Sequence, residues 1–361
     1  MKILFIVPYP TLGPSNRFRV EQYLPYLKKE GHTCFLRPFY NNALYNVLYK
    51  KGYYLKKIFT IFLLTFRRIT DIFIANHCDI IFIHREVFPL GGVIFEHFFK
   101  MTGKKIIYDF DDSLFLPDTS GANRFINVFK VPGKIKRIIQ MSDAVIAGNS
   151  FLRDYALNYS TKVYILPTPI DTEKYIPFTN KPYNKRIVIG WIGSSTTLKY
   201  LKLLENVFSE VSRQYSNVVF LVVGKDFKGY EHLNIEFKEW SLDSELSSLQ
   251  SFDIGIMPLT DDYWSRGKCA FKAIQYMSVG IPVVASDVGM NKEVIKNGIN
   301  GFLVRNDKEW IDKLKLLIEN ANLRKEMGIA SRKIVEEKYS LKVNAPRLLG
   351  IIEKVYTQNN T

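Results

Sequence analysis

Short runs of apolar residues alternate along the chain with stretches whose apolar residues repeat at helical spacing. Continuous apolar runs are typical of parallel strands, because such strands are buried on both faces. The runs lie at 3–7, 79–84, 105–110, 144–148, 186–193, 218–224, 253–259 and 281–286, and helix-like stretches include 19–29, 92–101 and 341–356. Strands that alternate with helices predict an α/β fold with parallel sheets covered on both faces.

A Pro-containing stretch separates two series of strands, which predicts two Rossmann-like domains. We expect the first domain at 1–168, a linker at 169–185 and the second domain at 186–340, with a helix at 341–361 packing back on the first. Ligands of such sheets bind beyond the carboxyl ends of the strands. The expected site is therefore a cleft between the two domains.

The charge balance favours an anionic partner, since 50 Lys and Arg residues against 35 Asp and Glu residues give a formal net charge of +15. Phosphorylated substrates or a membrane surface fit, whereas no nucleic-acid-binding module is recognisable. The three cysteines share no metal-like spacing, which indicates the cytoplasm and no structural zinc. The first apolar run is too short for a signal peptide, and the longest apolar stretch, at 57–67, is shorter than the roughly 20 residues of a spanning helix.

The loop after the strand at 186–193 contains Gly193, Ser194 and Ser195 and leads into a helix-like stretch. A glycine allows a close backbone turn, and the start of a helix presents free N–H groups to an anion. An ordinary capped helix start explains the same residues, because the lysine of a P-loop is absent. Phosphate binding by this loop is a hypothesis.

Three cations, Arg266, Lys268 and Lys272, lie where the pattern predicts the start of a helix. If that helix begins near Lys268, then Lys268, Lys272 and Gln275 share one face. Cations there oppose the helix dipole at a cost of about 0.3–1 kcal/mol each when exposed, and a bound diphosphate would reverse that sign. The alternative is that Asp261 and Asp262 neutralise them.

The stretch "KAIQYMSVGIPVVASDVGMNKEVIKNGINGFLV" (272–304) resembles the C-terminal domain of retaining GT-B glycosyltransferases, in particular glycosyltransferase family 4. The N-terminal "KILFIVPYP…SNRFRVEQYLPYLKKEGH" and the segment "AVIAGNSFLRDYA…VYILPTPIDTEKY" (144–175) are also similar to that family. The resemblance implies a GT-B fold, with two Rossmann-like domains facing across a cleft. It further implies a nucleotide-sugar donor, retention of configuration, and neither a metal nor another cofactor.

The chain departs from the family at its Glu-x7-Glu signature, where Gly267 and Gln275 stand instead. The usual glycine-arginine of the nucleotide loop is Gly190-Trp191. By resemblance, Gln275 holds the ribose through its amide. The remaining nucleotide contacts implied are Gly224, Lys238 and Trp240, although a buried packing role for Trp240 is the commoner explanation. The cations Arg266, Lys268 and Lys272 are then the residues expected to bind the diphosphate.

In the first domain, Asp109, Asp111 and Asp112 lie at the carboxyl end of one strand. The family often has His-Asp there, so Asp109 is the expected catalytic residue that positions the sugar or the acceptor hydroxyl. Three carboxylates also raise a metal hypothesis, which we set aside because the family dispenses with metal.

Four further loop residues are expected to contact substrate by resemblance. Gly13 occupies the position where the family's backbone approaches the diphosphate, and Arg17 lies nearby. The neighbouring Arg19 could instead face solvent. Arg85 and Glu86, at another strand end, could face the acceptor or form a structural pair. Asp111 and Asp262 are the remaining candidates for the donor sugar or the acceptor.

From Tyr40 to Thr70 the chain has no acidic residue but has Lys50, Lys51, Lys56, Lys57, Arg67 and Arg68 among apolar residues. This pattern is typical of an amphipathic segment at a membrane surface, or of a basic face covering the first domain. The predicted protein is a peripheral glycosyltransferase at the inner face of the cell membrane. It takes a nucleotide sugar and a glycan or polyprenyl-linked acceptor for cell-surface polysaccharide synthesis. The alternatives are a non-catalytic sugar-nucleotide- or glycan-binding subunit, or other GT-B chemistry such as an epimerase or phosphorylase.

Overall fold

The structure is a computed structural model that describes residues 1–48, 50, 52–116, 131–178, 186–224 and 233–358. Residues 179–185 of the expected linker and 359–361 of the expected C-terminal helix lie outside the described residues. Contacts divide the chain into two compact units, which we describe separately. Unit 1 comprises Met1–Pro169 with Asn344–Thr361, and unit 2 comprises Ile170–Val343.

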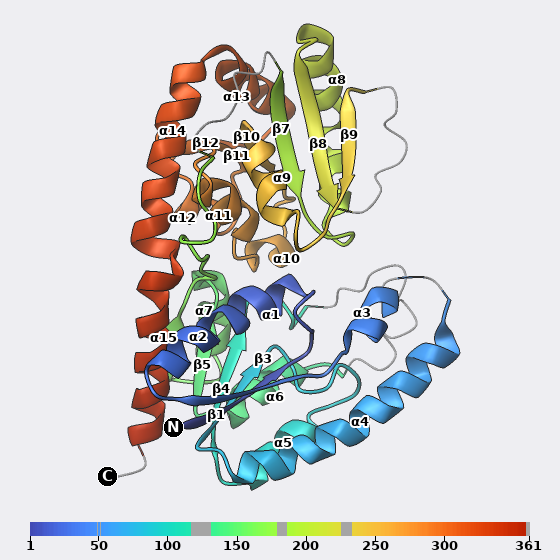
Figure 1. Cartoon of the computed structure of the whole chain (residues 1–361), viewed down its shortest axis with the longest axis vertical. Coiled ribbons are helices and arrows are strands. Elements are labelled where there is room, and N and C mark those ends of the chain that lie inside the picture. Colours follow the sequence, from blue (N-terminus) through green and yellow to red (C-terminus); the bar gives the residue numbers. More distant parts are fainter. Residues whose placement is uncertain (49, 51, 117–130, 179–185, 225–232, 359–361) are drawn as a thin grey trace. The chain divides into compact units, whose positions relative to one another are not determined.

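Six described strands of unit 1 form a parallel sheet in the order β2-β1-β3-β4-β5-β6 (Figure 1). Its central strands are apolar and almost wholly buried, as parallel strands between helical layers must be. The strands are β1 (Lys2–Val7), β2 (Thr33–Pro38), β3 (Ile80–His84), β4 (Lys105–Phe110), β5 (Ala144–Ala147) and β6 (Val163–Ile165). The helices between them are α1 (Pro14–Arg19), α2 (Leu24–Lys29), α3 (Asn42–Leu48), α4 (Tyr54–Asn76), α5 (Ile94–Met101), α6 (Lys134–Met141) and α7 (Ser150–Leu157).

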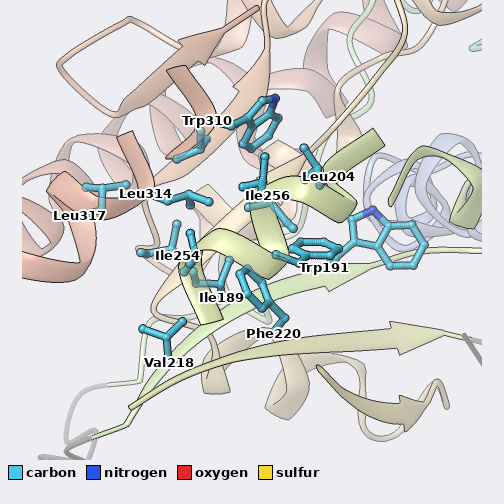
Figure 2. Close-up of a cluster of buried hydrophobic side chains, with 14 of the residues drawn as sticks. Ile189, Trp191, Leu204, Val218, Phe220, Ile254, Ile256, Trp310, Leu314 and Leu317 are labelled. Atoms are coloured by element: carbon cyan, nitrogen blue, oxygen red, sulfur yellow. The ribbon is translucent and has the colours of Figure 1, made fainter. Parts of the chain in front are cut away.

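Six described strands of unit 2 form a second parallel sheet, in the order β12-β11-β10-β7-β8-β9. Trp191, Phe220 and Trp310 lie in the buried cluster on one side of this sheet (Figure 2). The strands are β7 (Ile187–Ile192), β8 (Val218–Gly224), β9 (Ile235–Glu239), β10 (Ile254–Met257), β11 (Val283–Ser286) and β12 (Gly301–Val304). The α-helices are α8 (Glu205–Gln214), α9 (Glu245–Ser251), α10 (Tyr263–Arg266), α11 (Phe271–Ser278), α12 (Asn291–Val294), α13 (Asp307–Glu319) and α14 (Ala321–Ile334), and 3₁₀ helix η3 covers Leu198–Leu204.

The last helix, α15 (Leu341–Thr357), begins in unit 2 and continues in unit 1. There it lies along β6, because Lys354 covers the Tyr164 ring at 5.5 Å and Lys162 Nζ donates to Gln358 Oε1 at 2.7 Å. The C-terminal residues thereby become part of the first unit's packing.

The predicted α/β class with parallel sheets is confirmed, and the differences concern short elements. Strands β2, β6, β9 and β12, which are the edges of the two sheets, escaped the pattern, and the first three are partly exposed. The stretch expected as one helix at 19–29 is broken into α1, a 3₁₀ turn at Glu21–Tyr23 and α2. Pro25 accounts for the late start of α2, since proline fits best in the first turn of a helix.

Candidate functional site

Each sheet has one point where the strand order reverses. In unit 1 the reversal lies between β1 and β3, and in unit 2 between β7 and β10. The two loops that leave such a point diverge to opposite sides, which opens a crevice beyond the carboxyl ends of the strands. Each unit therefore carries one candidate half-site.

Asp109 on β4 is the centre of a buried network in unit 1. Its side chain is 1% exposed and forms an ion pair with Arg19 of α1. His84, the last residue of β3, places Nδ1 at 2.6 Å from Asp109 Oδ2. Burial alone would raise the pKa of Asp109, but Arg19 and His84 outweigh burial and hold that pKa below its ordinary value. Asp109 is therefore an ionised, fully engaged carboxylate, and the idea that Arg19 faces solvent is wrong.

The network continues from His84 to the surface of unit 1. Ser15 Oγ lies 2.6 Å from His84 Nε2 and donates at 3.1 Å to Asp111 Oδ2. Arg85 Nε donates to Asp111 Oδ1 at 2.7 Å. Burial would raise the pKa of Asp111, but Arg85 and then His84 lower it well below its ordinary value. The half-buried hydroxyl of Ser15 is thus the outer end of a chain that runs through His84 to Asp109.

The other expected residues of unit 1 surround this network in different ways. Glu86 accepts from Lys134 Nζ at 2.9 Å, which is a structural ion pair to α6 rather than the considered pair with Arg85. Arg17 is buried, with its guanidinium 4.8 Å from the Phe18 ring. Gly13 precedes α1, and a Cβ there would lie 2.5 Å from Tyr9 Cβ. Only a glycine permits that close turn after β1.

The half-site of unit 2 is built on two glycines and one lysine. A Cβ on Gly193 would lie 2.7 Å from Lys272 Cε and 2.6 Å from Trp191 ring carbons. A Cβ on Gly224, at the end of β8, would lie 2.6 Å from the Gly193 carbonyl oxygen. The Lys272 ammonium lies 5.7 Å from the centre of the Trp191 ring, within reach of a cation–π interaction. The structure therefore brings Lys272 to the backbone at Gly193, over 79 positions of sequence separation (272 − 193).

The loop beyond Gly193 presents donors to the outside. Ser194 and Ser195 are exposed, and in the described part of the chain their backbone N–H groups donate to no other group. The N–H of Gly193 itself donates to Val223 O at 3.0 Å. A short stretch of exposed N–H groups near a lysine side chain is an arrangement that can receive an anion.

The prediction that a helix begins near Lys268 is wrong. α10 ends at Arg266 and α11 begins at Phe271, so only Lys272 stands in the first turn of α11. Ala270 interrupts the helix, because its left-handed φ of 49° turns the chain between them. Lys268 and Gln275 therefore do not share a helix.

The remaining polar residues of this segment are engaged within unit 2. Arg266 Nε donates to the exposed Asp261 at 2.8 Å, which is the neutralising alternative considered from the sequence. Lys268 Nζ lies 5.4 Å from the Trp264 ring. Asp262 caps α10, since its Oδ1 accepts from the Ser265 N–H at 2.7 Å and its Oδ2 from the Thr260 hydroxyl. Asp262 is thus a capping residue whose oxygens already have partners.

The residues expected to contact the nucleotide differ in how deeply they are buried. Gln275 is buried in α11. Lys238 is exposed in edge strand β9. Trp240 is half-buried, and its Nε1 donates to Glu245 Oε2 at 2.9 Å, while Tyr175 also donates to Glu245. The Trp240 ring is therefore held by a buried carboxylate.

Two of the three described residues other than glycine that have a positive φ, Arg85 and Ala270, lie next to candidate residues. Three described residues other than glycine have a positive φ: Tyr53, Arg85 and Ala270. Arg85 follows β3 directly with φ of 64°, and its N–H donates to Asp109 O at 2.7 Å. Such conformations persist where the surroundings impose them, and they concentrate at functional sites.

Among the described residues, no group of three or more His, Cys, Asp or Glu side chains is arranged to hold a metal ion. The carboxylates of Asp109 and Asp111 are directed at Arg19, His84 and Arg85 instead. This finding concerns only metal ligands that the side chains of the described residues would supply.

Sequence reasoning missed Ser15, and it gave His84 and Arg19 no role in the site. A signal was present, because each of these residues follows β1 or ends β3, the two strands that flank the reversal point. Polar residues next to such a point are the ones to examine. Their mutual contacts depend on strand order, which the sequence does not state.

Known proteins share both the fold and part of the sequence. A family model described as Glycosyl transferases group 1 matches residues 186–320, which include Gly193 and Lys272. Spore coat protein SA of Bacillus subtilis (strain 168) is 23% identical over 188 residues, which are 48% of this chain and 50% of that protein. The chain thus matches half the length of this curated relative.

Solved structures extend the similarity to nearly the whole chain. Anabaena Alr3699/HepE in complex with UDP-glucose has a TM-score of 0.72 at 13% identity, over 98% of this chain and 100% of that chain. A glycosyltransferase from Rickettsia africae ESF-5 has a TM-score of 0.71 at 17% identity, over 99% of both chains. With the two six-stranded sheets of the described residues, these similarities show that the chain has the GT-B fold.

Within the part of the chain that the structure describes, every helix is too short or too polar to cross a membrane.

Proposed function

We propose that this protein is a glycosyltransferase that moves a sugar from a nucleotide-sugar donor to a glycan or lipid-linked acceptor. The observation that carries the proposal is the contact of the Lys272 side chain with Gly193, inside the segment that matches Glycosyl transferases group 1. The resemblance to family 4 supports retention of configuration, a hexosyl donor and a role in cell-surface polysaccharide synthesis. UDP-glucose in the HepE complex supports a nucleotide sugar as donor.

The chemical need in this reaction is to stabilise the leaving nucleoside diphosphate. When the bond between the anomeric carbon and the phosphate oxygen breaks, negative charge grows on the diphosphate. A fixed ammonium and outward N–H groups at that position lower the barrier because they require no reorganisation. Lys272 and the N–H groups of Ser194 and Ser195 meet this need, and we propose that they do so without a metal. Lys268 and Arg266 are secondary candidates, since Arg266 already has Asp261 as partner.

Unit 1 would supply the groups that meet the sugar or the acceptor hydroxyl. Asp109 is too deeply buried to touch a substrate, so we propose that it positions His84 and that Ser15 makes the contact. In neutral His84, Nδ1–H donates to Asp109 and Nε2 accepts from Ser15. In protonated His84, Nε2–H donates to Ser15, whose own proton then turns to Asp111. In both arrangements the Ser15 proton is given to His84 or to Asp111, so Ser15 offers an incoming hydroxyl a lone pair.

We also propose that the protein works at the inner face of the cell membrane, where a polyprenyl-linked acceptor would lie. The net charge of +15 and the acid-free segment from Tyr40 to Thr70 support an anionic surface as partner.

A screen of UDP-, GDP-, dTDP- and ADP-sugars tests the proposed reaction, with hydrolysis and transfer to a membrane lipid extract as readouts in the presence of a metal chelator. Lys272→Ala should lower turnover by roughly 10²–10³-fold. The exposed Lys296→Ala is the matched control and should leave turnover unchanged. Absence of binding and turnover with every donor would refute the proposal. Tight donor binding without turnover would favour the non-catalytic subunit, an alternative that the glycine at position 267 keeps open.

A further inference from the structure

Helix α4 of unit 1 has its charged side turned into the protein. Arg68 and Asp71 have side chains only 1% exposed, and Arg68 NH1 donates to Asp71 Oδ2 at 2.8 Å. Arg68 also donates to the Arg37 carbonyl oxygen at 3.1 Å, and Arg37 forms an ion pair with Asp71. The buried Lys57 Nζ donates to the Lys50 carbonyl oxygen at 2.6 Å. These contacts fix the helix, because any rotation about its axis would leave buried charges without partners.

The opposite side of α4 is apolar and faces outward. We call this side the outer face of α4. It comprises Leu55, Ile58, Phe59, Phe62, Phe66 and Phe73, whose exposed fractions lie between 54% and 86%. From Leu55 to Phe73 this face extends for about 27 Å along the helix. An ordinary surface helix has the reverse arrangement, with apolar residues inward and charges outward.

Helix α5 adds to the exposed apolar surface of the same unit. It packs against α4, as Figure 1 also shows, and itself exposes Ile94, Phe98 and Met101. Single exposed apolar residues are normal, whereas a long run on one helix marks a surface that another body covers.

The charges around the outer face indicate what covers it. Lys50 and Lys56 are exposed beside it, and the single acidic residue of α4, Asp71, is buried. The α4 helix of a second copy would therefore offer these cations no carboxylate, whereas an anionic lipid surface offers opposite charge throughout. Tyr53 and Tyr54 at the start of the helix suit the water boundary of a bilayer, where tyrosine is enriched.

We propose that the outer face of α4 docks on an anionic lipid bilayer, with the helix lying in the plane of the interface and its apolar side chains inserted. The proposal rests on the membrane location proposed above. It gives that location a different physical cause, which is insertion of apolar side chains rather than attraction of cations. Lys57 and Arg68, two of the cations expected to attract the membrane, are turned inward. Apolar insertion is therefore the main attraction, and the remaining cations make the smaller contribution.

Flotation of the full chain with phosphatidylcholine vesicles and with vesicles containing phosphatidylglycerol tests the proposal at low and high salt. We expect binding to both kinds, stronger to the anionic one, and most of it retained at high salt. The double variant Phe62→Asn/Phe66→Asn should weaken binding to both at least about tenfold. The matched control Ile329→Asn removes an apolar side chain that is 63% exposed in unit 2 and should change nothing.

A second measurement avoids variants that remove apolar surface. All four tryptophans, at 191, 240, 264 and 310, lie in unit 2, so Phe66→Trp adds a separate reporter on α4. Brominated lipid should quench the additional fluorescence of this variant relative to the wild type.

Four outcomes would overturn the proposal. They are no vesicle binding, unchanged binding of the double variant, no quenching, and binding only to anionic vesicles that salt abolishes. A dimer that the double variant dissociates, without vesicle binding, would identify a second copy as the cover. Donor hydrolysis measured on the same samples keeps the proposed reaction separate, since it needs no membrane.

Discussion

The buried ion pair of Arg19 and Asp109 gives the sharpest quantitative prediction. Both side chains are 1% exposed, and Arg19 Nε donates to Asp109 Oδ2 at 3.2 Å in addition to the closer ion pair with Oδ1. Asp109→Asn keeps the shape but leaves the guanidinium without a counter-charge in the interior. Removing one partner of a buried pair costs about 3–5 kcal/mol, far more than an exposed pair contributes.

The measurement must report on unit 1, because tryptophan fluorescence reports on unit 2 alone. Urea unfolding followed by hydrogen exchange of the β3 and β4 amides should show a loss of about 3–5 kcal/mol in Asp109→Asn. The exposed pair of Arg153 and Asp154, also in unit 1, provides the control, and Asp154→Asn should cost at most about 1 kcal/mol. The double variant Arg19→Met/Asp109→Asn should be less destabilised than the sum of its single variants.

The pH dependence follows from the lowered pKa of Asp109. Burial acts to raise that pKa, but Arg19 and His84 outweigh it, so the folded state binds the proton less readily than the unfolded state. The contribution of the carboxylate is present above the unfolded pKa of about 3.9 and is lost as the pH falls through the lower, folded value. Asp109→Asn should remove this part of the acid sensitivity. If Asp109→Asn lost no more unfolding free energy than Asp154→Asn, the reasoning on this ion pair would be refuted.

Two further variants test the half-sites separately. Gly193→Ala places a Cβ 2.6 Å from the buried Trp191 ring, and should cost about 1–3 kcal/mol in tryptophan-monitored unfolding of unit 2. Gly350→Ala, in helix α15 of unit 1 with open space around it, should instead stabilise that unit, as measured by hydrogen exchange of its amides, and a neutral Gly193→Ala would contradict the close approach. Ser15→Ala should lower kcat by about 10²-fold or more, whereas Ser15→Thr retains the hydroxyl and should retain more of the activity. Equal kcat values for Ser15→Ala and Ser15→Thr would show that the Ser15 hydroxyl takes no part in the reaction.

The sequence by itself determined the α/β class and the four inner strands of each described sheet. Runs such as residues 3–7 and 218–224 are apolar at every position, and only burial on both faces stabilises such a strand. It also identified the loop at Gly193, because a glycine at the end of a strand and before a helix has a local backbone meaning. These properties are local, so a window of a few residues contains them.

The tertiary structure alone decided which of these residues meet. Asp109 and Arg19 are 90 positions apart, and their contact depends on β1, β3 and β4 being neighbours. The side of α4 on which Arg68 lies was equally hidden, since the charge pattern predicts cations outward, whereas contacts with residues distant in sequence, including Arg37 and Val7, hold this one inward. Whether a segment is buried follows from its own apolar residues. The partner of a buried charge depends instead on the order of the strands across the whole sheet.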